Sequence, residues 1–352
     1  MSEATSESTS ESAATSKHGS SGGAPITLHD VTKEYAGTDE PAVDSINLEI
    51  DAGEFVVLVG PSGCGKTTTM RMINRLVEPT SGKITIGDDD VMQLNVEDLR
   101  RGIGYVIQQG GLFPHMTIAQ NVALVPKLLK WKDDRVKARV EEMLDLVGLD
   151  PGSYLERFPR QLSGGQQQRV GVARALAADP PIMLMDEPFG AVDPITRVRL
   201  QDEFLSLQRE LGKTIVFVTH DFDEALKMGD RIVVLRQGSH IAQFDRPEII
   251  LAAPADDFVA GFVGRGASLK RLSLQSLARY EMDEAETTGN GIPTVSVTGT
   301  MHDALDVMLG TGQDRVNVFG EDDRPVGSVT LAGILREMQD LDRARARNTD
   351  AP

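Results

Sequence analysis

A glycine-rich stretch near the start of the chain has the residue types and spacing of a phosphate-binding loop. The sequence GPSGCGKT, Gly60 to Thr67, matches the pattern G-x-x-x-x-G-K-[ST]. Its backbone N–H groups can surround a β-phosphate, Lys66 can neutralise the β- and γ-phosphates, and the Thr67 hydroxyl can bind Mg²⁺. Cys64 is expected to fill space rather than to react as a thiol. The residues of this stretch that we expect to bind ATP are Gly60, Pro61, Ser62, Gly63, Cys64, Gly65, Lys66, Thr67 and Thr68.

Two carboxylates and a histidine follow two later apolar runs. IMLMDEP ends in Asp186 and Glu187, and IVFVTHD ends in His220. We expect Asp186 to bind Mg²⁺, usually through water, and Glu187 to act as the general base for an attacking water. A lone histidine at a strand end is more often structural, but its place beside these carboxylates favours contact with the γ-phosphate and orientation of Glu187. Glu187 and His220 are therefore the predicted catalytic residues.

Parallel strands are the elements that would bring these residues together. EFVVLVG, PIMLMDEP and TIVFVTHD are short, continuous apolar runs of the kind found in strands buried on both faces of a parallel sheet. Ligands of such sheets sit beyond the carboxyl ends of the strands. The predicted fold is therefore α/β, and the phosphate loop, the carboxylates and His220 should meet at one sheet edge.

Other segments predict the surroundings of this sheet. From Ile26 the chain reads as a β-rich layer, and a hairpin is expected to turn near Gln237 and Gly238. A helical subdomain is predicted over residues 115–178. One of its helices should bury the apolar face formed by Val136, Val140, Met143, Leu144 and Val147.

A second helix N-terminus that could bind a phosphate is predicted in QLSGGQQQRVGVARAL. Ser163, Gly164, Gly165 and Gln166 open a predicted helix, whose N-terminus suits an anion. With the phosphate loop before it and the Asp-Glu strand after it, LSGGQ resembles the signature of the ATP-binding-cassette family, over roughly residues 26–262. The resemblance implies a P-loop NTPase fold with an antiparallel β layer. It also implies that two cassettes pack head to tail, so that each signature holds the γ-phosphate of the ATP bound to the other subunit.

The resemblance also assigns roles to three further residues. Gln108 in YVIQQ corresponds to the loop glutamine that senses Mg²⁺ and contacts the membrane partner, and Asp193 in GAVDP corresponds to the aspartate at the dimer seam. Tyr35 in KEYAG is expected to stack on adenine, although an isolated tyrosine in a strand usually packs against neighbours. Val192 stands where many family members have leucine.

The stretches TTTMRMINRLVEPTSG and RGIGYVIQQGGLFPHMTIAQNVALVPKLLKW resemble ATPase subunits of osmoprotectant importers, for solutes such as glycine betaine, choline, carnitine and proline betaine. This implies membrane permease subunits, an extracytoplasmic substrate-binding protein, and a place at the cytoplasmic face of the membrane. Leu112, Phe113 and His115 are expected to line a groove for the permease, although Leu112 has an equal claim to the core. Import of another small polar solute, such as an amino acid or polyamine, and a non-transport ABC ATPase are the alternatives.

The C-terminal region is similar to a cystathionine-β-synthase (CBS)-type regulatory module. Residues 292–338 read strand, helix, strand, turn, strand, helix. In this resemblance an aspartate often follows the GxVT strand to hold ribose, but here Thr330 is followed by Leu331, which argues against a nucleotide. Sensing of ionic strength and bracing of the dimer remain the open roles. The predicted organisation is a tail at 1–25, a cassette at 26–264, a linker or remnant module at 265–290, the module at 291–340 and a tail at 341–352.

Composition excludes several other functions. The chain has 352 residues and a formal net charge of −17, which repels nucleic acid, and no strong basic patch offsets it. Cys64, the single cysteine, excludes an internal disulfide and indicates a reducing compartment. No apolar run is long enough to cross a bilayer. The acidic composition suits a salt-rich cell interior about as well as it suits an ordinary soluble protein.

Overall fold

The computed structural model describes residues 22–107, 111–190, 192–264, 266–283, 292–320, 322 and 324–339. The tail predicted at the N-terminus therefore lies almost wholly outside the described residues. Within these ranges no helix is both long and apolar enough to cross a membrane.

A six-stranded sheet forms the centre of the larger unit. Five of its strands are parallel, and the edge strand β10 pairs antiparallel with β9, as the hairpin near Gln237 predicts. Its strand order is β10 (Ile241–Asp245), β9 (Arg231–Leu235), β3 (Phe55–Val59), β8 (Thr214–Val218), β7 (Ile182–Asp186) and β6 (Ile103–Val106). The three apolar runs are thus neighbouring strands, and their polar ends lie at one edge.

Both faces of this sheet are covered. Along β3, Phe55, Val57 and Val59 belong to one apolar core, while Val56 and Leu58 belong to the other. All five are buried, which explains why the strand is apolar throughout rather than alternating.

The antiparallel layer packs on one of these cores, which also contains residues of α1. Its strand order is β2 (Val43–Ile50), β1 (Ile26–Lys33), β4 (Ser81–Ile86) and β5 (Asp89–Asp90). The remaining helical segments of this larger unit are α1 (Lys66–Ile73), α2 (Val96–Arg101), α8 (Pro194–Leu211), α9 (Phe222–Met228), η2 (Gln237–Ser239), α10 (Pro247–Ala252) and α11 (Asp257–Val263).

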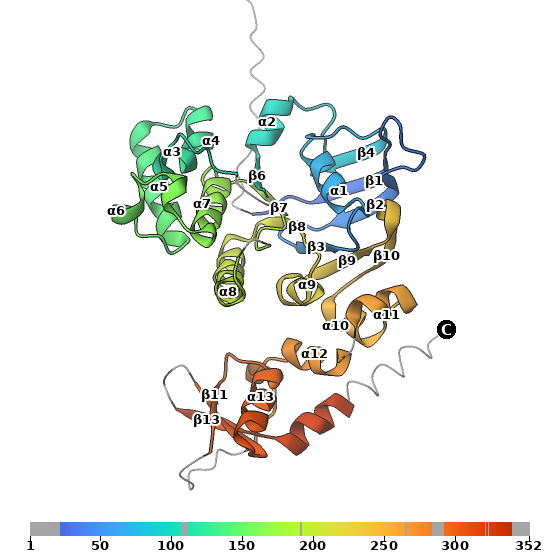
Figure 1. Ribbon diagram of the computed structural model, residues 1–352, viewed down its shortest axis with the longest axis vertical. Coiled ribbons are helices and arrows are strands. Elements are labelled where there is room, and N and C mark those ends of the chain that lie inside the picture. Colours follow the sequence, from blue (N-terminus) through green and yellow to red (C-terminus); the bar gives the residue numbers. More distant parts are fainter. Residues whose placement is uncertain are drawn as a thin grey trace, which may run out of the picture.

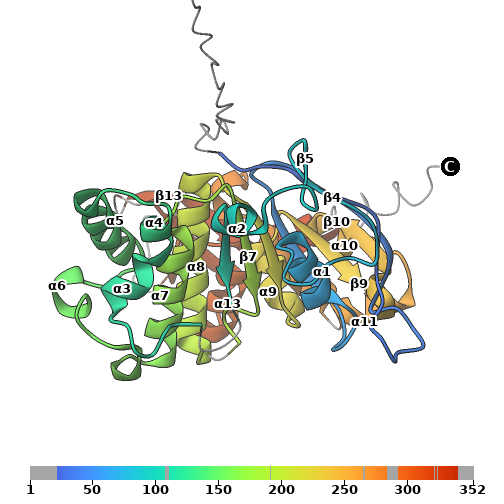
Figure 2. The same ribbon diagram turned by 90° about the horizontal axis from the view of Figure 1, so that it is seen from above.

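The helical subdomain stands to one side of the sheet (Figures 1 and 2). It comprises α3 (Ile118–Val122), α4 (Leu124–Leu128), α5 (Asp133–Leu146), α6 (Pro151–Tyr154), η1 (Pro159–Gln161) and α7 (Gly164–Leu176). The predicted apolar face of α5 and its C-terminal flank is confirmed, because Val136, Val140, Met143, Leu144 and Val147 are all buried.

The C-terminal region has a small core of its own. Its elements are α12 (Ala267–Leu274), η3 (Leu277–Arg279), β11 (Thr294–Ser296), α13 (Met301–Thr311), β12 (Arg315–Phe319), β13 (Pro325–Thr330) and a helix over 331–339. The predicted order of strands and helices is confirmed. The segment interpreted as a linker or remnant does more than connect, because Leu272 and Leu277 are fully buried in this core.

Candidate functional site

The phosphate loop joins the buried strand β3 to helix α1. Gly63 and Gly65 have φ values of 78° and 104°, which residues with a side chain rarely adopt. A Cβ atom on Gly65 would also collide with the Ala42 carbonyl oxygen and the Ser239 hydroxyl. Gly65 is therefore required by both torsion and space, whereas Gly63 is required by torsion alone, because a Cβ atom there would meet no neighbour.

Within this loop the Lys66 ammonium donates hydrogen bonds to the carbonyl oxygens of Gly60, at 2.7 Å, and Pro61, at 3.0 Å. The side chain is largely buried, so its charge is held beside the loop backbone. Pro61, Ser62 and Gly63 are exposed, whereas the Cys64 side chain is completely buried. Burial fits the interpretation of Cys64 as a space-filling residue.

The ends of β7 and β8 bring the predicted chemical groups next to the loop. The Thr67 hydroxyl donates to a carboxylate oxygen of Asp186 at 2.9 Å, and Arg71 lies 3.8 Å from the other oxygen. Burial raises the pKa of Asp186, while the Thr67 hydrogen bond and the Arg71 charge oppose that shift. A hydroxyl facing a carboxylate is a donor set that suits Mg²⁺, which binds one or two carboxylates and takes other oxygens from phosphate and water.

Glu187 and His220 form a second pair beside this one. The Nδ1 atom of His220 lies 3.3 Å from Oε2 of Glu187, and the histidine side chain is mostly exposed. The Glu187 backbone N–H donates to the carbonyl oxygen of Val218 on β8 at 2.9 Å, so the strand pairing continues one residue beyond β7. Glu187 also has a positive φ of 43°. Adjacent carboxylates thus reach different partners, Asp186 toward Thr67 and Glu187 toward His220.

Tyr35 lies on a loop that touches the phosphate loop. Its ring is 42% exposed, and the Lys33 ammonium lies 5.1 Å from the ring centroid. The loop closes where the Ala42 N–H donates to the Lys33 carbonyl oxygen at 2.8 Å, and Ala42 is the residue that abuts Gly65. The loop that carries Tyr35 therefore meets the phosphate loop at Ala42, and an exposed aromatic ring offers a surface on which a base can stack.

The signature stretch forms a complete helix start. Ser163 is the N-cap of α7; its hydroxyl accepts the Gln166 N–H at 3.3 Å, and the Gln166 side chain accepts the Ser163 N–H at 2.9 Å. Ser163 and Gly164 are exposed. Both views place β7 between α7 and α1, so the signature helix and the helix that follows the phosphate loop lie on opposite sides of this strand (Figures 1 and 2).

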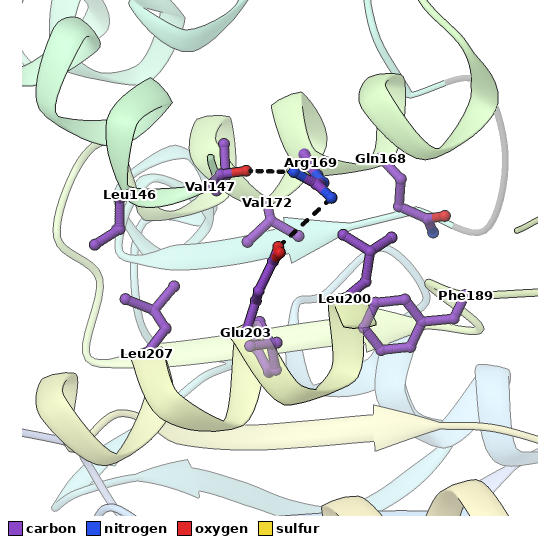
Figure 3. A pocket seen from close by; sticks show the side chains of 10 residues that line it. Leu146, Val147, Gln168, Arg169, Val172, Phe189, Leu200, Glu203 and Leu207 are labelled. Carbon is purple, nitrogen blue, oxygen red and sulfur yellow. Dashed lines mark hydrogen bonds and ion pairs between the residues drawn. The ribbon is translucent and has the colours of Figure 1, made fainter. Parts of the chain in front are cut away.

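An apolar pocket with one ion pair links α7 to α8. Arg169 follows the signature on α7. Its guanidinium group donates to the Val147 carbonyl oxygen at 3.3 Å and lies 3.6 Å from Glu203 of α8 (Figure 3). Leu146, Val172, Leu200 and Leu207 are among the pocket's apolar walls. None of the residues predicted to bind the nucleotide lines this pocket, and its lining residues join the helical subdomain to α8.

The remaining predicted residues are Asp193, Gln108 and the three residues of the expected groove. Asp193 is the exposed N-cap of α8 and accepts the Thr196 N–H at 3.0 Å, which holds the pKa of its carboxyl below the usual range. Gln108 lies outside the described residues. Of the three residues expected to line a groove, Leu112 is buried, whereas Phe113 and His115 are exposed with ring centroids 6.0 Å apart.

The motif analysis missed Arg71, which lies beside Asp186 in the site, and Arg169, which pairs with Glu203 outside it. Arg71 lies one helical turn after Thr67, so helical spacing alone could have placed both side chains on one face of α1. For Arg169 the helix period gives a face but not its partner Glu203, which comes from another helix.

Comparisons with known proteins agree with this geometry. A family described as "ABC transporter" matches residues 43–190. The glycine betaine/carnitine/choline transport ATP-binding protein OpuCA of Bacillus subtilis is 52% identical over 322 residues, covering 91% of this chain and 81% of that protein. The spermidine/putrescine import ATP-binding protein PotA of Thermobifida fusca is 50% identical over 241 residues, 68% of this chain and 62% of that protein.

A solved structure supports the same fold. An ATP-binding cassette described as dimeric, in a post-hydrolysis state bound to ADP and Pi, matches with a TM-score of 0.57 and 38% identity. The match covers 63% of this chain and 98% of that chain. The cassette fold predicted from the sequence is therefore confirmed.

Proposed function

The chain belongs to the ABC transporter ATP-binding family, and from this membership we propose that it hydrolyses ATP to drive an importer of quaternary-ammonium osmoprotectants such as glycine betaine, carnitine and choline. The observation that carries the choice of solute is the extent of similarity to OpuCA, which runs over 91% of the chain. The polyamine relative is almost as identical but matches a shorter stretch, 68% of the chain. Import of a polyamine is therefore the second candidate.

Hydrolysis at this site would divide the work between the two carboxylates. Glu187 accepts a proton from water, whose oxygen bonds to the γ-phosphorus while the bond from that phosphorus to the β–γ bridging oxygen breaks, releasing ADP and phosphate. His220, 3.3 Å from Glu187, orients this base and contacts the γ-phosphate. Lys66 neutralises phosphate charge. Thr67 and Asp186 would hold Mg²⁺, which supplies further neutralisation of the phosphates when bound.

A homodimer is part of the proposal because the solved cassette that matches this chain is described as dimeric. Ser163, Gly164 and Gly165 open a helix whose N-terminus suits an anion, and by the family resemblance they would bind the γ-phosphate held by a second copy. Near the expected seam, Ile195 lies two residues after Asp193 and is 86% exposed, and Val198 on the next turn of α8 is 52% exposed.

Contact with membrane permease subunits is proposed for the surface that carries Phe113 and His115. These rings lie within the segment after Gln108 that is expected to face the permease, and they are exposed, whereas Leu112 belongs to the core. An extracytoplasmic substrate-binding protein would deliver the solute to the permease, so this chain itself would sit at the cytoplasmic face and never touch the solute.

We further propose that the cassette comprises residues 26–264 and that residues 291–340 form a CBS-type module that braces the dimer. In place of a ribose-binding aspartate, Thr330 uses its hydroxyl to accept the Gly333 N–H at 3.1 Å, at the start of the helix over 331–339. The Tyr280 hydroxyl lies so near Gly333 that a side chain there would collide with it. Both contacts join residues of the same chain at the place where ribose would be held, and they favour a structural role over nucleotide binding.

Reconstitution tests the choice of solute. The chain is co-purified with its permease, placed in proteoliposomes with the associated binding protein, and assayed for ATP hydrolysis stimulated by glycine betaine or by putrescine. We expect stimulation by glycine betaine alone, with the Glu187→Gln variant as the inactive control. Stimulation by putrescine alone would favour the polyamine importer, and hydrolysis that responds to neither solute would contradict both.

A further inference from the structure

Lys270 of the C-terminal region contacts the cassette at three points. Its ammonium lies 2.6 Å from a carboxylate oxygen of Asp223 and donates to the Val263 carbonyl oxygen at 3.2 Å. It also lies 5.7 Å from the centroid of the Phe222 ring. One side chain from α12 therefore ties the first turn of α9 to the last residue of α11, where a positive charge is favourable.

The part of α9 that Lys270 contacts is continuous with His220. After β8 ends at Val218, Thr219 is buried, His220 is exposed, and Asp221 caps α9. The Asp221 carboxylate accepts the N–H groups of Asp223, at 2.9 Å, and Glu224, at 3.2 Å. The Asp221 N–H in turn donates to the Thr219 hydroxyl at 3.1 Å. His220 is thus held between a buried residue and a helix cap that contains Asp223.

We propose that Lys270 is a positioning residue for His220, so that the C-terminal region sets the rate of ATP hydrolysis through its contact with α9. The inference rests on the proposed role of His220 in hydrolysis. Lys270 fixes Asp223, Asp223 belongs to the cap of α9, and the cap fixes the direction in which His220 leaves the strand.

The location of α12 supports this route. Ala267 and Leu274 pack against the cassette core, whereas Leu272 belongs to the C-terminal core. Figure 1 shows α12 between the cassette helices α9 and α10 on one side and α13 on the other. A displacement of the C-terminal strands would therefore move Lys270 relative to α9.

A role limited to docking makes a different prediction. Loss of a docking contact would lower thermal stability and leave the turnover of the folded protein unchanged. A positioning role instead lowers kcat for ATP hydrolysis and leaves KM for ATP close to that of the original chain, because His220 would act on the water and γ-phosphate rather than on nucleotide capture.

The test compares Lys270→Ala, Lys270→Arg and the control Lys137→Ala, an exposed lysine of α5, in the full-length chain. We expect Lys270→Ala to lower kcat about three- to tenfold with KM for ATP changed less than about twofold. Lys270→Arg should recover most of the rate, and Lys137→Ala should match the original chain. Hydrogen exchange of the backbone amides over 219–224 should become faster in Lys270→Ala.

Two further results keep the outcomes distinct. In an Asp223→Asn background the Lys270→Ala change should have little additional effect on kcat, since its partner has already lost its charge. An unchanged kcat with unchanged exchange over 219–224 would overturn the positioning role. A chain that fails to hydrolyse ATP before any substitution would instead overturn the proposed function, while the exchange measurement would still report on the Lys270 contact.

Discussion

The Nδ1 atom of His220 lies 3.3 Å from Oε2 of Glu187, although the two residues follow different strands of the sheet. The parallel pairing of β7 with β8 creates this proximity, since it brings the carboxyl ends of both strands to one edge. Substitution of these two residues is therefore the most direct test of the site.

Glu187→Gln should separate ATP binding from hydrolysis. Glutamine keeps the size and hydrogen-bonding reach of the side chain but cannot accept a proton from water, so hydrolysis should fall by about 10²–10⁴-fold. ATP affinity, measured by equilibrium binding, should stay within a few-fold of the original. The control is Glu49→Gln, an exposed position on β2. Unchanged turnover in Glu187→Gln would exclude Glu187 as the general base.

The head-to-tail dimer predicts which damaged subunits can complement one another. In a mixed dimer of Lys66→Ala with Ser163→Arg subunits, both lesions fall on one nucleotide site and the other stays intact. If one subunit carries both changes, each site has one lesion. With Glu187→Gln in every subunit to prevent hydrolysis, we expect one occluded ATP per dimer in the first case and none in the second. Equal occlusion would argue against sites shared between subunits.

Asp186 should make the folded protein less stable as the pH rises. Burial raises the pKa of this carboxyl, so the native state binds its proton more tightly than the unfolded state does. Its favourable contribution is complete below the unfolded pKa of about 3.9 and is lost as the pH rises through the higher native value.

Asp186→Asn should remove this loss of stability at higher pH, because asparagine has no proton to lose. The thermal midpoint of the variant should exceed that of the original chain at pH 7, on a scale of about 2–4 °C per 1 kcal/mol. This difference in thermal midpoint should disappear toward acidic pH. Calorimetry across the pH range measures this, with Glu224→Gln as a comparison at another carboxyl whose pKa burial raises. An Asp186→Asn protein that is less stable at every pH would show that the hydrogen bond and the Arg71 contact outweigh burial.

Tyr35 should contribute to ATP affinity through its ring. Stacking of a base on an aromatic side chain is worth about 1–3 kcal/mol, so Tyr35→Ala should weaken ATP binding by roughly tenfold or more. Tyr35→Phe keeps the ring and should bind ATP as the original chain does. Titration with ATP and with inorganic triphosphate distinguishes the causes, because only ATP affinity should change. Equal losses for both ligands would place Tyr35 outside the adenine site.

The sequence was sufficient for the parts of the site that end buried strands. An apolar run such as IMLMD admits little except a fully buried strand, so its polar neighbours had to lie at the sheet edge, and Thr67 indeed meets Asp186 there. The Ser163 cap was equally readable, because its partner Gln166 lies within the same turn. Where a strand end or the spacing within one turn determines the contact, the prediction succeeds.

Contacts between distant elements left no comparable signal. The ion pairs of Arg169 with Glu203 and of Lys270 with Asp223 depend on how separate helices pack, and in the sequence the charged residues at these positions read as ordinary solvated residues. Leu112 was ambiguous for a related reason, because an apolar residue in a loop fits an interface and a core equally well until its neighbours are known. The domain limits of the C-terminal region stay a prediction.

The left-handed torsion of Glu187 restricts what evolution or a mutagenesis library can place there. Branching at Cβ makes valine, isoleucine and threonine poor fits at a φ of 43°, whatever their polarity, whereas glycine, asparagine and aspartate tolerate it. Codon randomisation at position 187 should therefore yield well-folded but inactive chains only from a narrow set of amino acids. The backbone conformation at position 187 would then restrict the tolerated amino acids before any selection for catalysis acts on them.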